Sequence, residues 1–123
     1  MRYMMFIKHP EDYRGKTPPA KLYEAMGEFV GAAQKSGVFI DGAGLQPTDA
    51  GTRIKLKAGR ITTTDGPFTE SKEIVGGYAL MELKSREEAL EYGRQFMELH
   101  RIHWPEFEGE CEIRPLELFD PTS

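Results

Sequence analysis

Residues 3–7 read Tyr3-Met4-Met5-Phe6-Ile7, a stretch that is apolar at every position rather than at alternate ones. A strand with one solvated face would alternate between apolar and polar side chains. We therefore expect both faces of this strand to be covered. Helices would cover one face, and in so short a chain a second subunit is the expected cover for the other.

A helix is expected after this strand. Thr17 is a suitable N-cap, and Pro18 and Pro19 are tolerated in a first turn, where a missing N–H leaves no bond unmade. Gly37 stands where a left-handed residue commonly closes a helix. Between them, apolar residues recur at helical spacing, at positions Leu22, Met26, Phe29, Val30 and Ala33.

Short strands and a hairpin follow. One strand is expected at residues 38–40, and the glycines of residues 41–44 then predict a tight exit from it, since Pro47 argues against a phosphate-binding helix start. Strands at residues 53–56 and 60–64 form a hairpin around a turn at residues 57–59, and another strand is expected at residues 78–83.

The second helix and the last strand complete the pattern. Ser85 and Glu88 form a capping box that starts the helix, which we expect to fade near His100. The strand at residues 110–119 contains Pro115, which has no N–H to donate, and is therefore expected at a sheet edge.

The predicted order is strand, helix, strand, hairpin, strand, helix, strand. Right-handed crossovers on one sheet then give the split βαβ arrangement of a ferredoxin-like α+β domain, with the hairpin as an insertion. The last strand lies at an edge in this arrangement, which agrees with the position of Pro115.

Length and composition limit the possible functions. The 123 residues suit one domain, residues 1–123, and a net charge of −4 with a pI of about 5.4 argues against direct binding to nucleic acid. The single cysteine, Cys111, excludes an intramolecular disulfide. The N-terminal apolar run is too short for a signal peptide or a membrane span, so we expect a cytoplasmic protein without membrane contact.

The segment Thr64-Asp65-Gly66-Pro67-Phe68-Thr69-Glu70 is the most distinctive in the chain, and Lys72, Glu73 and Gly76-Gly77-Tyr78 follow it closely. This pattern resembles the DGPF proteins of the YCII-related family, and the resemblance covers nearly the whole chain. It implies a homodimeric α+β barrel in which two ferredoxin-like sheets pack face to face. A second subunit of that kind would cover the outer face of residues 3–7.

The resemblance implies no general activity. Some members of the family are encoded beside extracytoplasmic-function sigma factors, which suggests a protein-interaction role in regulating transcription initiation. Other members of the wider group look like enzymes, with a His on the first helix paired to an Asp. That position falls at Met26 in this chain, and the first helix contains no His, so the pair is missing here.

Topology predicts where a site would lie, independently of the family. In the split βαβ arrangement, the first and second strands end at one edge of the sheet, where the third strand starts and the second helix ends. Four segments should therefore meet there: residues 9–13, 41–44, 65–73 and 100–104. They contain all three histidines together with Asp41 and Asp65.

Asp65 allows two interpretations. Its carboxylate could face a pocket as a base or a ligand anchor, as could that of Asp41. Alternatively, it could accept backbone N–H groups across its own turn, as aspartates in turns commonly do. Other ligand contacts are predicted around it and on the following strand, from Gly66, Pro67, Glu70, Lys72 and Tyr78.

His100, His103 and Trp104 form the second candidate group. Residues three apart lie on one helix face, so with His9 or Asp41 as a third ligand the two histidines could hold a divalent metal. Histidines near a helix C-terminus are also favoured by the helix dipole alone. We therefore predict no cofactor and no bound metal, and place these three residues and His9 among the ligand contacts.

The favoured function is binding of a small polar molecule in a cleft at this edge of a dimeric barrel, with acid–base or metal-assisted chemistry left open. The alternative is the protein-interaction role in transcription initiation. A binding protein needs a concave, polar-lined pocket with Asp65 turned inward. An interaction protein would instead leave a large apolar surface exposed after dimerisation.

Overall fold

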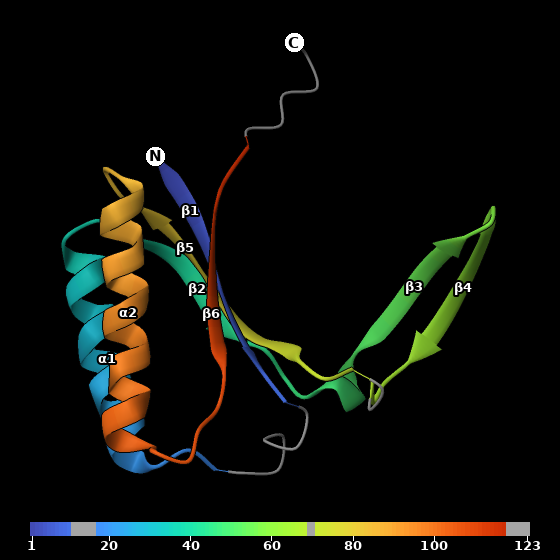
Figure 1. The fold of residues 1–123 in the computed structure, drawn as a ribbon, viewed down its shortest axis with the longest axis horizontal. Helices are drawn as coiled ribbons and strands as arrows, with labels where there is room; N and C mark the ends of the chain where they lie inside the picture. Colours follow the sequence, from blue (N-terminus) through green and yellow to red (C-terminus); the bar gives the residue numbers. More distant parts are fainter. Residues whose placement is uncertain (11–16, 69–70, 118–123) are drawn as a thin grey trace.

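A computed structural model describes residues 1–10, 17–68 and 71–117. Its main sheet consists of β1 (Arg2–His9), β2 (Phe39–Gly44), β5 (Ile74–Glu82) and β6 (Glu110–Pro115), and its helices are α1 (Ala20–Lys35) and α2 (Arg86–His103). The strands are antiparallel in the order β2-β5-β1-β6. Both helices lie on the same face of this sheet (Figure 1).

This topology is the predicted split βαβ arrangement. The unit β1-α1-β2 encloses β5, and the unit β5-α2-β6 encloses β1, so each helix connects two strands that are separated by one antiparallel neighbour. The chain is therefore a ferredoxin-like α+β domain. β6 lies at the edge of the sheet, as expected for a strand that contains Pro115. It ends at Pro115, whereas the sequence predicted a strand that continued past this residue.

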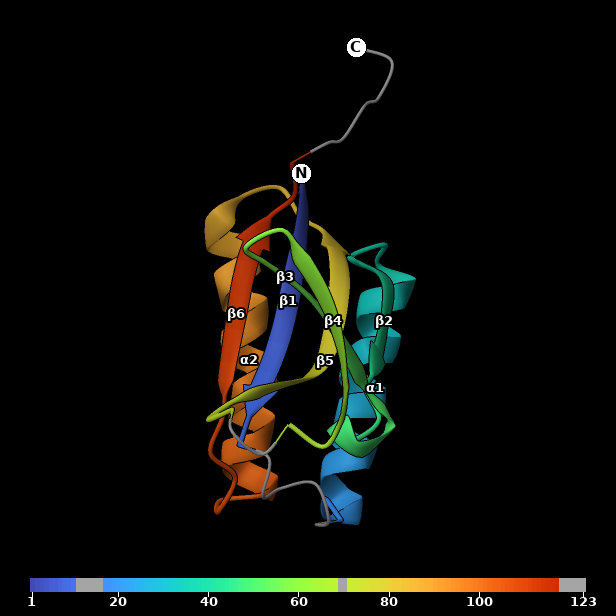
Figure 2. The same ribbon diagram turned by 90° about the vertical axis from the view of Figure 1, so that its right-hand side faces the viewer.

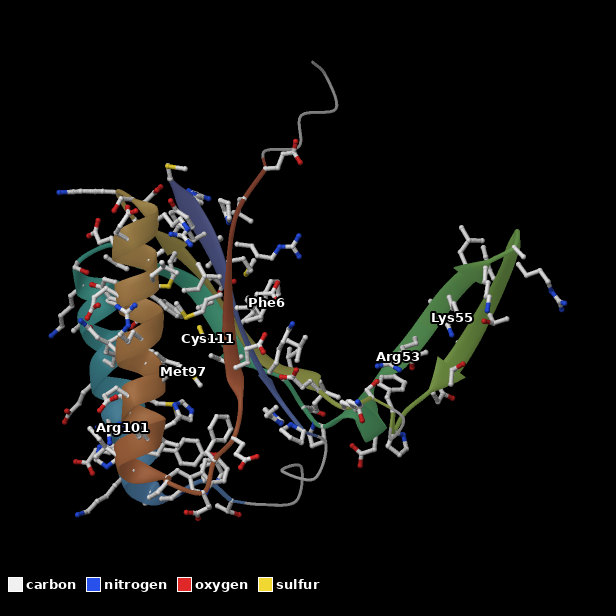
Figure 3. All side chains as sticks on the ribbon, viewed as in Figure 1. Phe6, Arg53, Lys55, Met97, Arg101 and Cys111 are labelled. Carbon is white, nitrogen blue, oxygen red and sulfur yellow. The ribbon has the colours of Figure 1, made fainter. Side chains whose placement is uncertain are left out.

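The apolar stretch in β1 contributes side chains to both faces of the sheet. Tyr3 and Met5 are buried in the cluster that the sheet forms beneath the helices. Met4 and Phe6 are half-buried and, because side chains alternate along a strand, lie on the other face. Phe6 points away from the helices (Figure 3). The helices thus cover one face of β1, as predicted, and cover of the other face by a second subunit stays a prediction.

Helix α1 begins later than its sequence suggested. Thr17 is not its cap: the N-cap is Pro19, which makes no side-chain cap bond, and the first helical residue is Ala20. The reason is that Thr17 and Pro18 each precede a proline, and the residue before a proline is pushed towards extended conformations. A helix could therefore not start before Pro19.

The end of α1 agrees with the prediction. Gly37 has a φ of 81°, which is the left-handed region, and its N–H donates to the Gln34 carbonyl at 3.1 Å. The N–H of Val38 donates to the Ala33 carbonyl at 2.9 Å. These two bonds form a Schellman motif, which satisfies carbonyls that the helix leaves unpaired.

Helix α2 has the predicted start and a longer body. The Ser85 hydroxyl accepts a bond from the Glu88 N–H, and the Glu88 carboxylate accepts one from the Lys84 N–H, each at 3.2 Å. The helix continues to His103 instead of fading near His100, and Trp104 caps it. Pro105 follows directly, and the residue before a proline is where helices commonly stop.

The strands around the glycines differ most from expectation. Residues 41–44 are not an exit from β2 but its second half, and β5 already begins at Ile74 rather than at Tyr78. The two segments pair with each other as far as Gly44 and Gly77. A Cβ on Gly42 would lie 2.7 Å from the Tyr78 carbonyl oxygen, so the strands approach closely because glycine is present.

The predicted hairpin insertion is present as β3 (Thr52–Lys57) and β4 (Arg60–Asp65), preceded by a short 3₁₀ turn, η2 (Thr48–Ala50). Ala58 and Gly59 connect the strands with φ values of 50° and 75°, as a type I′ hairpin turn requires. The hairpin projects on the side of the sheet opposite the helices (Figures 1 and 2). Among the described residues, no helix is long and apolar enough to cross a membrane.

Candidate ligand-binding site

A cavity of about 460 Å³ lies between the helices and the sheet. That volume is in the range of small-molecule sites. Both helices and three strands contribute to its walls, and most of the side chains that face it are apolar. They include Met5, Met26, Phe29, Phe39, Phe96 and Phe107.

His100 supplies a polar group within this wall. Its side chain is 7% exposed, its Nδ1 lies 3.0 Å from the Phe96 carbonyl oxygen, and its ring packs 5.1 Å from that of Phe96 and 4.8 Å from that of Phe107. Burial lowers the pKa of His100, because the charged imidazolium would lose its hydration. The neutral imidazole is therefore the favoured form near pH 7.

The hydrogen bond of His100 decides which nitrogen can meet a ligand. Since a carbonyl only accepts, Nδ1 must carry the proton, and Nε2 is then an acceptor. Within the described residues the structure shows no second hydrogen bond to this ring. The cavity wall thus contains a buried acceptor that a bound molecule could satisfy.

His9 lies at the same end of the cavity. Its ring is 6.3 Å from Phe107, which also contacts His100, and its Nδ1 is 2.9 Å from the Pro10 carbonyl oxygen. Gly76 makes room for it, because a Cβ at that position would lie 2.2 Å from Nε2 of His9. Gly76 therefore has a packing role at the site.

Two other predicted contacts line the cavity and one does not. Trp104 is buried against Phe107, with ring centroids 5.2 Å apart. Tyr78 borders the cavity from its place in β5, although its pairing with Phe6 puts its side chain on the other face of the sheet. His103 is half-buried on α2 and is not among the described residues that line the cavity. The spacing of three along the helix thus places only His100 in this wall.

The two aspartates lie apart from this cavity. Asp65 is exposed at the end of β4, where its Oδ1 accepts a hydrogen bond of 3.0 Å from the Thr52 hydroxyl on the paired strand. Asp41 is exposed on β2. Among the described residues that line the cavity there is no carboxylate. Of the segments that we predicted to meet, His9, residues 42–44 and His100 lie around one cavity. Asp41 and Asp65 do not line it.

The residues around Asp65 form the base of the hairpin. The Gly66 N–H donates to the Gly51 carbonyl at 2.8 Å, and a Cβ on Gly66 would lie 1.6 Å from the Thr48 carbonyl oxygen. The Phe68 N–H donates to the Thr48 hydroxyl at 3.1 Å. Phe68 is buried, and the Arg53 guanidinium lies 3.9 Å from its ring centroid. This segment thus joins the hairpin to the body through several specific contacts.

The remaining predicted contacts do not form a pocket with the histidines. Pro67 and Lys72 are exposed in the loop that connects β4 to β5. Glu70 lies outside the described residues, as does the part of the 9–13 segment that follows Pro10. Their predicted ligand contacts stay predictions.

The described residues contain neither a cluster of metal ligands nor an activated thiol. Over residues 1–10, 17–68 and 71–117, no three His, Cys, Asp or Glu side chains lie close enough to hold a metal ion. Cys111 is half-buried, and burial raises the pKa of its thiol to about 11. A thiol with so high a pKa is almost entirely protonated at pH 7 and is a poor nucleophile.

The sequence alone did not identify most of the cavity wall. Met26, Phe29 and Val30 fit the apolar stripe of α1, and the same spacing describes residues packed in a core and residues that border a cavity. Phe107 follows α2 in an irregular segment without a repeating pattern. The only available signal was the concentration of aromatic residues just after His100.

Two comparisons with known proteins match this chain. The model of the YCII-related domain matches residues 1–96. An uncharacterized protein of Rhizobium meliloti (strain 1021) is 35% identical over 79 residues, which are 64% of this chain and 60% of that protein. The chain thus spans about 60% of the length of this relative. The family match ends before His100, Trp104 and Phe107, so it includes most of the cavity but not its polar end.

Proposed function

The chain belongs to the YCII-related family, and on that premise we propose that it binds a small, mainly apolar molecule in the cavity between the helices and the sheet. The sequence favoured a polar ligand in a loop-edge cleft. The lining instead favours a ligand with an apolar body, because a polar body would lose its hydration among Met5, Phe29 and Phe39 without new hydrogen bonds.

The observation that carries the proposal is the buried acceptor on His100. A buried polar atom without a hydrogen bond costs about 1–3 kcal/mol relative to one with a partner. A hydroxyl or N–H group on the ligand would remove that cost by donating to Nε2. The ligand expected is therefore an apolar molecule with one donor group at the end that approaches His100 and His9.

The same atom offers the best starting point for a reaction. A neutral imidazole can accept a proton from a hydroxyl group held against it, which is general-base chemistry. His100 would take this role in place of Asp65 or Asp41. This step needs no metal ion.

Thermal unfolding in the presence of paired probes tests the proposal. We expect 4-ethylphenol to raise the Tm of the protein more than ethylbenzene does, because only the phenol donates to His100. The difference should disappear in His100→Leu and persist in His103→Leu, a matched change on the same helix outside the cavity wall. Equal effects of both probes on the wild-type protein, or no effect of either, would contradict the proposal.

We also propose that the chain forms a homodimer through the sheet face that the helices leave uncovered. Met4 and Phe6 of β1 pair with Leu80 and Tyr78 of β5, so these four half-buried side chains form one patch on that face. Sheets pack face to face at about 10 Å when their facing side chains are apolar. Light scattering should give twice the chain mass for the wild type and the single mass for Phe6→Asp.

A further inference from the structure

The hairpin of residues 52–65, called the arm from here on, has an apolar face that no other described residue of its own chain covers. Leu56 pairs with Ile61, and Ile54 pairs with Thr63, so the three aliphatic side chains lie on one face. Ile54 is 73% exposed, and Leu56 and Ile61 are each 71% exposed. No other part of the described chain groups large aliphatic side chains at comparable exposure.

An arm of this kind gains little stability from itself. A two-stranded hairpin is at best marginally stable in water, because it has no second layer against which to bury side chains. Removing a Leu or Ile side chain from water is favourable in proportion to the apolar area that is buried. The three exposed side chains on this face are therefore a large driving force for packing on another surface.

The base of the arm fixes the direction in which it projects. Gly66 touches the backbone at Thr48, Phe68 is buried beneath Arg53, and the Arg53 guanidinium also donates to the Ser71 hydroxyl at 2.9 Å. Held in this way, the arm extends past the uncovered face of the sheet and away from both helices (Figures 1 and 2). Lys55 lies in the middle of the arm, well away from the sheet (Figure 3).

The charge of the arm is opposite to that of the rest of the chain. Arg53, Lys55, Lys57 and Arg60 against Asp65 give the arm a net charge of +3, so the remaining residues of a chain with net charge −4 carry −7. The four cations lie on the face opposite Ile54 and Leu56, because they occupy the alternate positions. Opposite charges on arm and body favour the approach of one copy to another.

The uncovered sheet face also continues beyond its central patch. Val75, at the start of β5, and Leu116, directly after β6, lie at opposite ends of this face and are 39% and 40% exposed. If two sheets pack on one another through the central patch of Met4, Phe6, Tyr78 and Leu80, Val75 and Leu116 at the ends of the face remain exposed to solvent. They provide apolar surface on which an arm from the other copy can pack.

We propose that the arm packs its apolar face on the body of a second copy of this chain, so that each subunit of the dimer is held by the arm of the other. The inference rests on the homodimer proposed above and adds a second, separate contact to it. The contacts of Asp65, Gly66 and Phe68 at the base of the arm would then hold it where a partner can reach it.

Photo-crosslinking with mixed isotope labels tests the arm directly. Benzoylphenylalanine would be placed at position 56 on the apolar face, or as a control at position 62 on the basic face, in equal mixtures of ¹⁴N and ¹⁵N chains. We expect crosslinks that join one light and one heavy chain from position 56, and far fewer from position 62. Crosslinks from position 56 that stay within one chain would overturn the proposal.

The dimer affinity gives an independent measurement. Leu56→Asp should weaken the dimer about tenfold or more, as loss of a buried anchor does, with an unchanged circular dichroism spectrum. A dimer of unchanged affinity would overturn the role of the arm and leave the sheet-to-sheet dimer standing. A wild-type chain that is monomeric at all concentrations would overturn both, and would leave the arm to a different protein, as in the role linked to extracytoplasmic-function sigma factors.

Discussion

The main sheet and the arm use the same antiparallel pairing but differ in what covers them. Tyr3 on β1 is 3% exposed beneath the helices, whereas Ile54 on β3 is 73% exposed. β1 is apolar at every position from 3 to 7, and β3 alternates between apolar and basic residues. Strand pairing and a suitable turn are enough to shape a hairpin, but its stability comes from packing on a second layer. The described part of the chain provides no such layer for the arm.

The largest expected difference between the two regions comes from the same substitution made in each. Leu22→Ala should lower the free energy of unfolding by about 2–5 kcal/mol, because Leu22 on α1 is 1% exposed. Leu56→Ala should change it by no more than about 0.5 kcal/mol in the monomeric Phe6→Asp background, where no partner covers the arm.

Urea unfolding followed by circular dichroism measures both values. Equal losses for Leu22→Ala and Leu56→Ala would mean that the arm is packed within its own chain, and the distinction between the two regions would fail.

Thiol reactivity gives the next largest contrast. The pKa of the Cys111 thiol is raised to about 11, so its thiolate is scarce near pH 7.5. A cysteine at position 56, introduced by Leu56→Cys with Cys111→Ser, should have an ordinary pKa of about 8.5 and react at least about 100-fold faster in the same monomeric background.

The rate of reaction with Ellman's reagent, followed by absorbance, checks this ratio. Urea-unfolded samples of the two proteins should react at similar rates, since unfolding removes the burial that raises the pKa of Cys111. Similar rates in the folded proteins would contradict the burial of Cys111 on the helix-covered side of the sheet.

A smaller effect concerns the pH dependence of stability, which arises from His100 in the helix-covered part of the chain and not from the arm. The pKa of His100 is lowered in the folded chain from its usual 6.5, so the unfolded chain binds the proton first as the pH falls. The stability that neutral His100 contributes is therefore complete above about pH 6.5 and is lost as the pH falls from there to the folded pKa. His100→Phe should reduce this loss, while the matched change His103→Phe should leave it in place.

Scanning calorimetry between pH 5 and pH 8 measures this dependence as the change in Tm. If His100→Phe and the wild type lose the same number of degrees between pH 7 and pH 5, then His100 is not the group responsible, and its placement in the cavity wall would need revision.

The sequence predicted the parts of this fold that are governed by local chemistry. Gly37 ends α1, Ser85 caps α2, and Ala58 and Gly59 turn the arm, because each of these depends on backbone preferences within a few residues. The start of α1 was wrong for a local reason too, since Thr17 and Pro18 each precede a proline and that restriction outweighed the capping preference of threonine.

The site was harder to predict because it is built by tertiary contacts. His9, His100 and Phe107 come from separate elements and meet only after the sheet forms, so no spacing along the chain relates them. The loop around Asp65 made it a reasonable candidate for a ligand contact. Its carboxylate instead accepts a hydrogen bond from the Thr52 hydroxyl across the hairpin. Topology correctly predicted that His9 and His100 would lie near one another, and could not predict that the wall around them is apolar.

Hydrogen exchange at two protein concentrations tests the central claim, that the body is stable by itself and the arm depends on a partner. At a concentration where the chain is dimeric, amides of both β1 and β3 should be protected. On dilution below the dissociation constant, or in Phe6→Asp, protection should fall in β3 and β4 and persist in β1 and β5. Protection of β3 that stays the same in dimer and monomer would contradict the account.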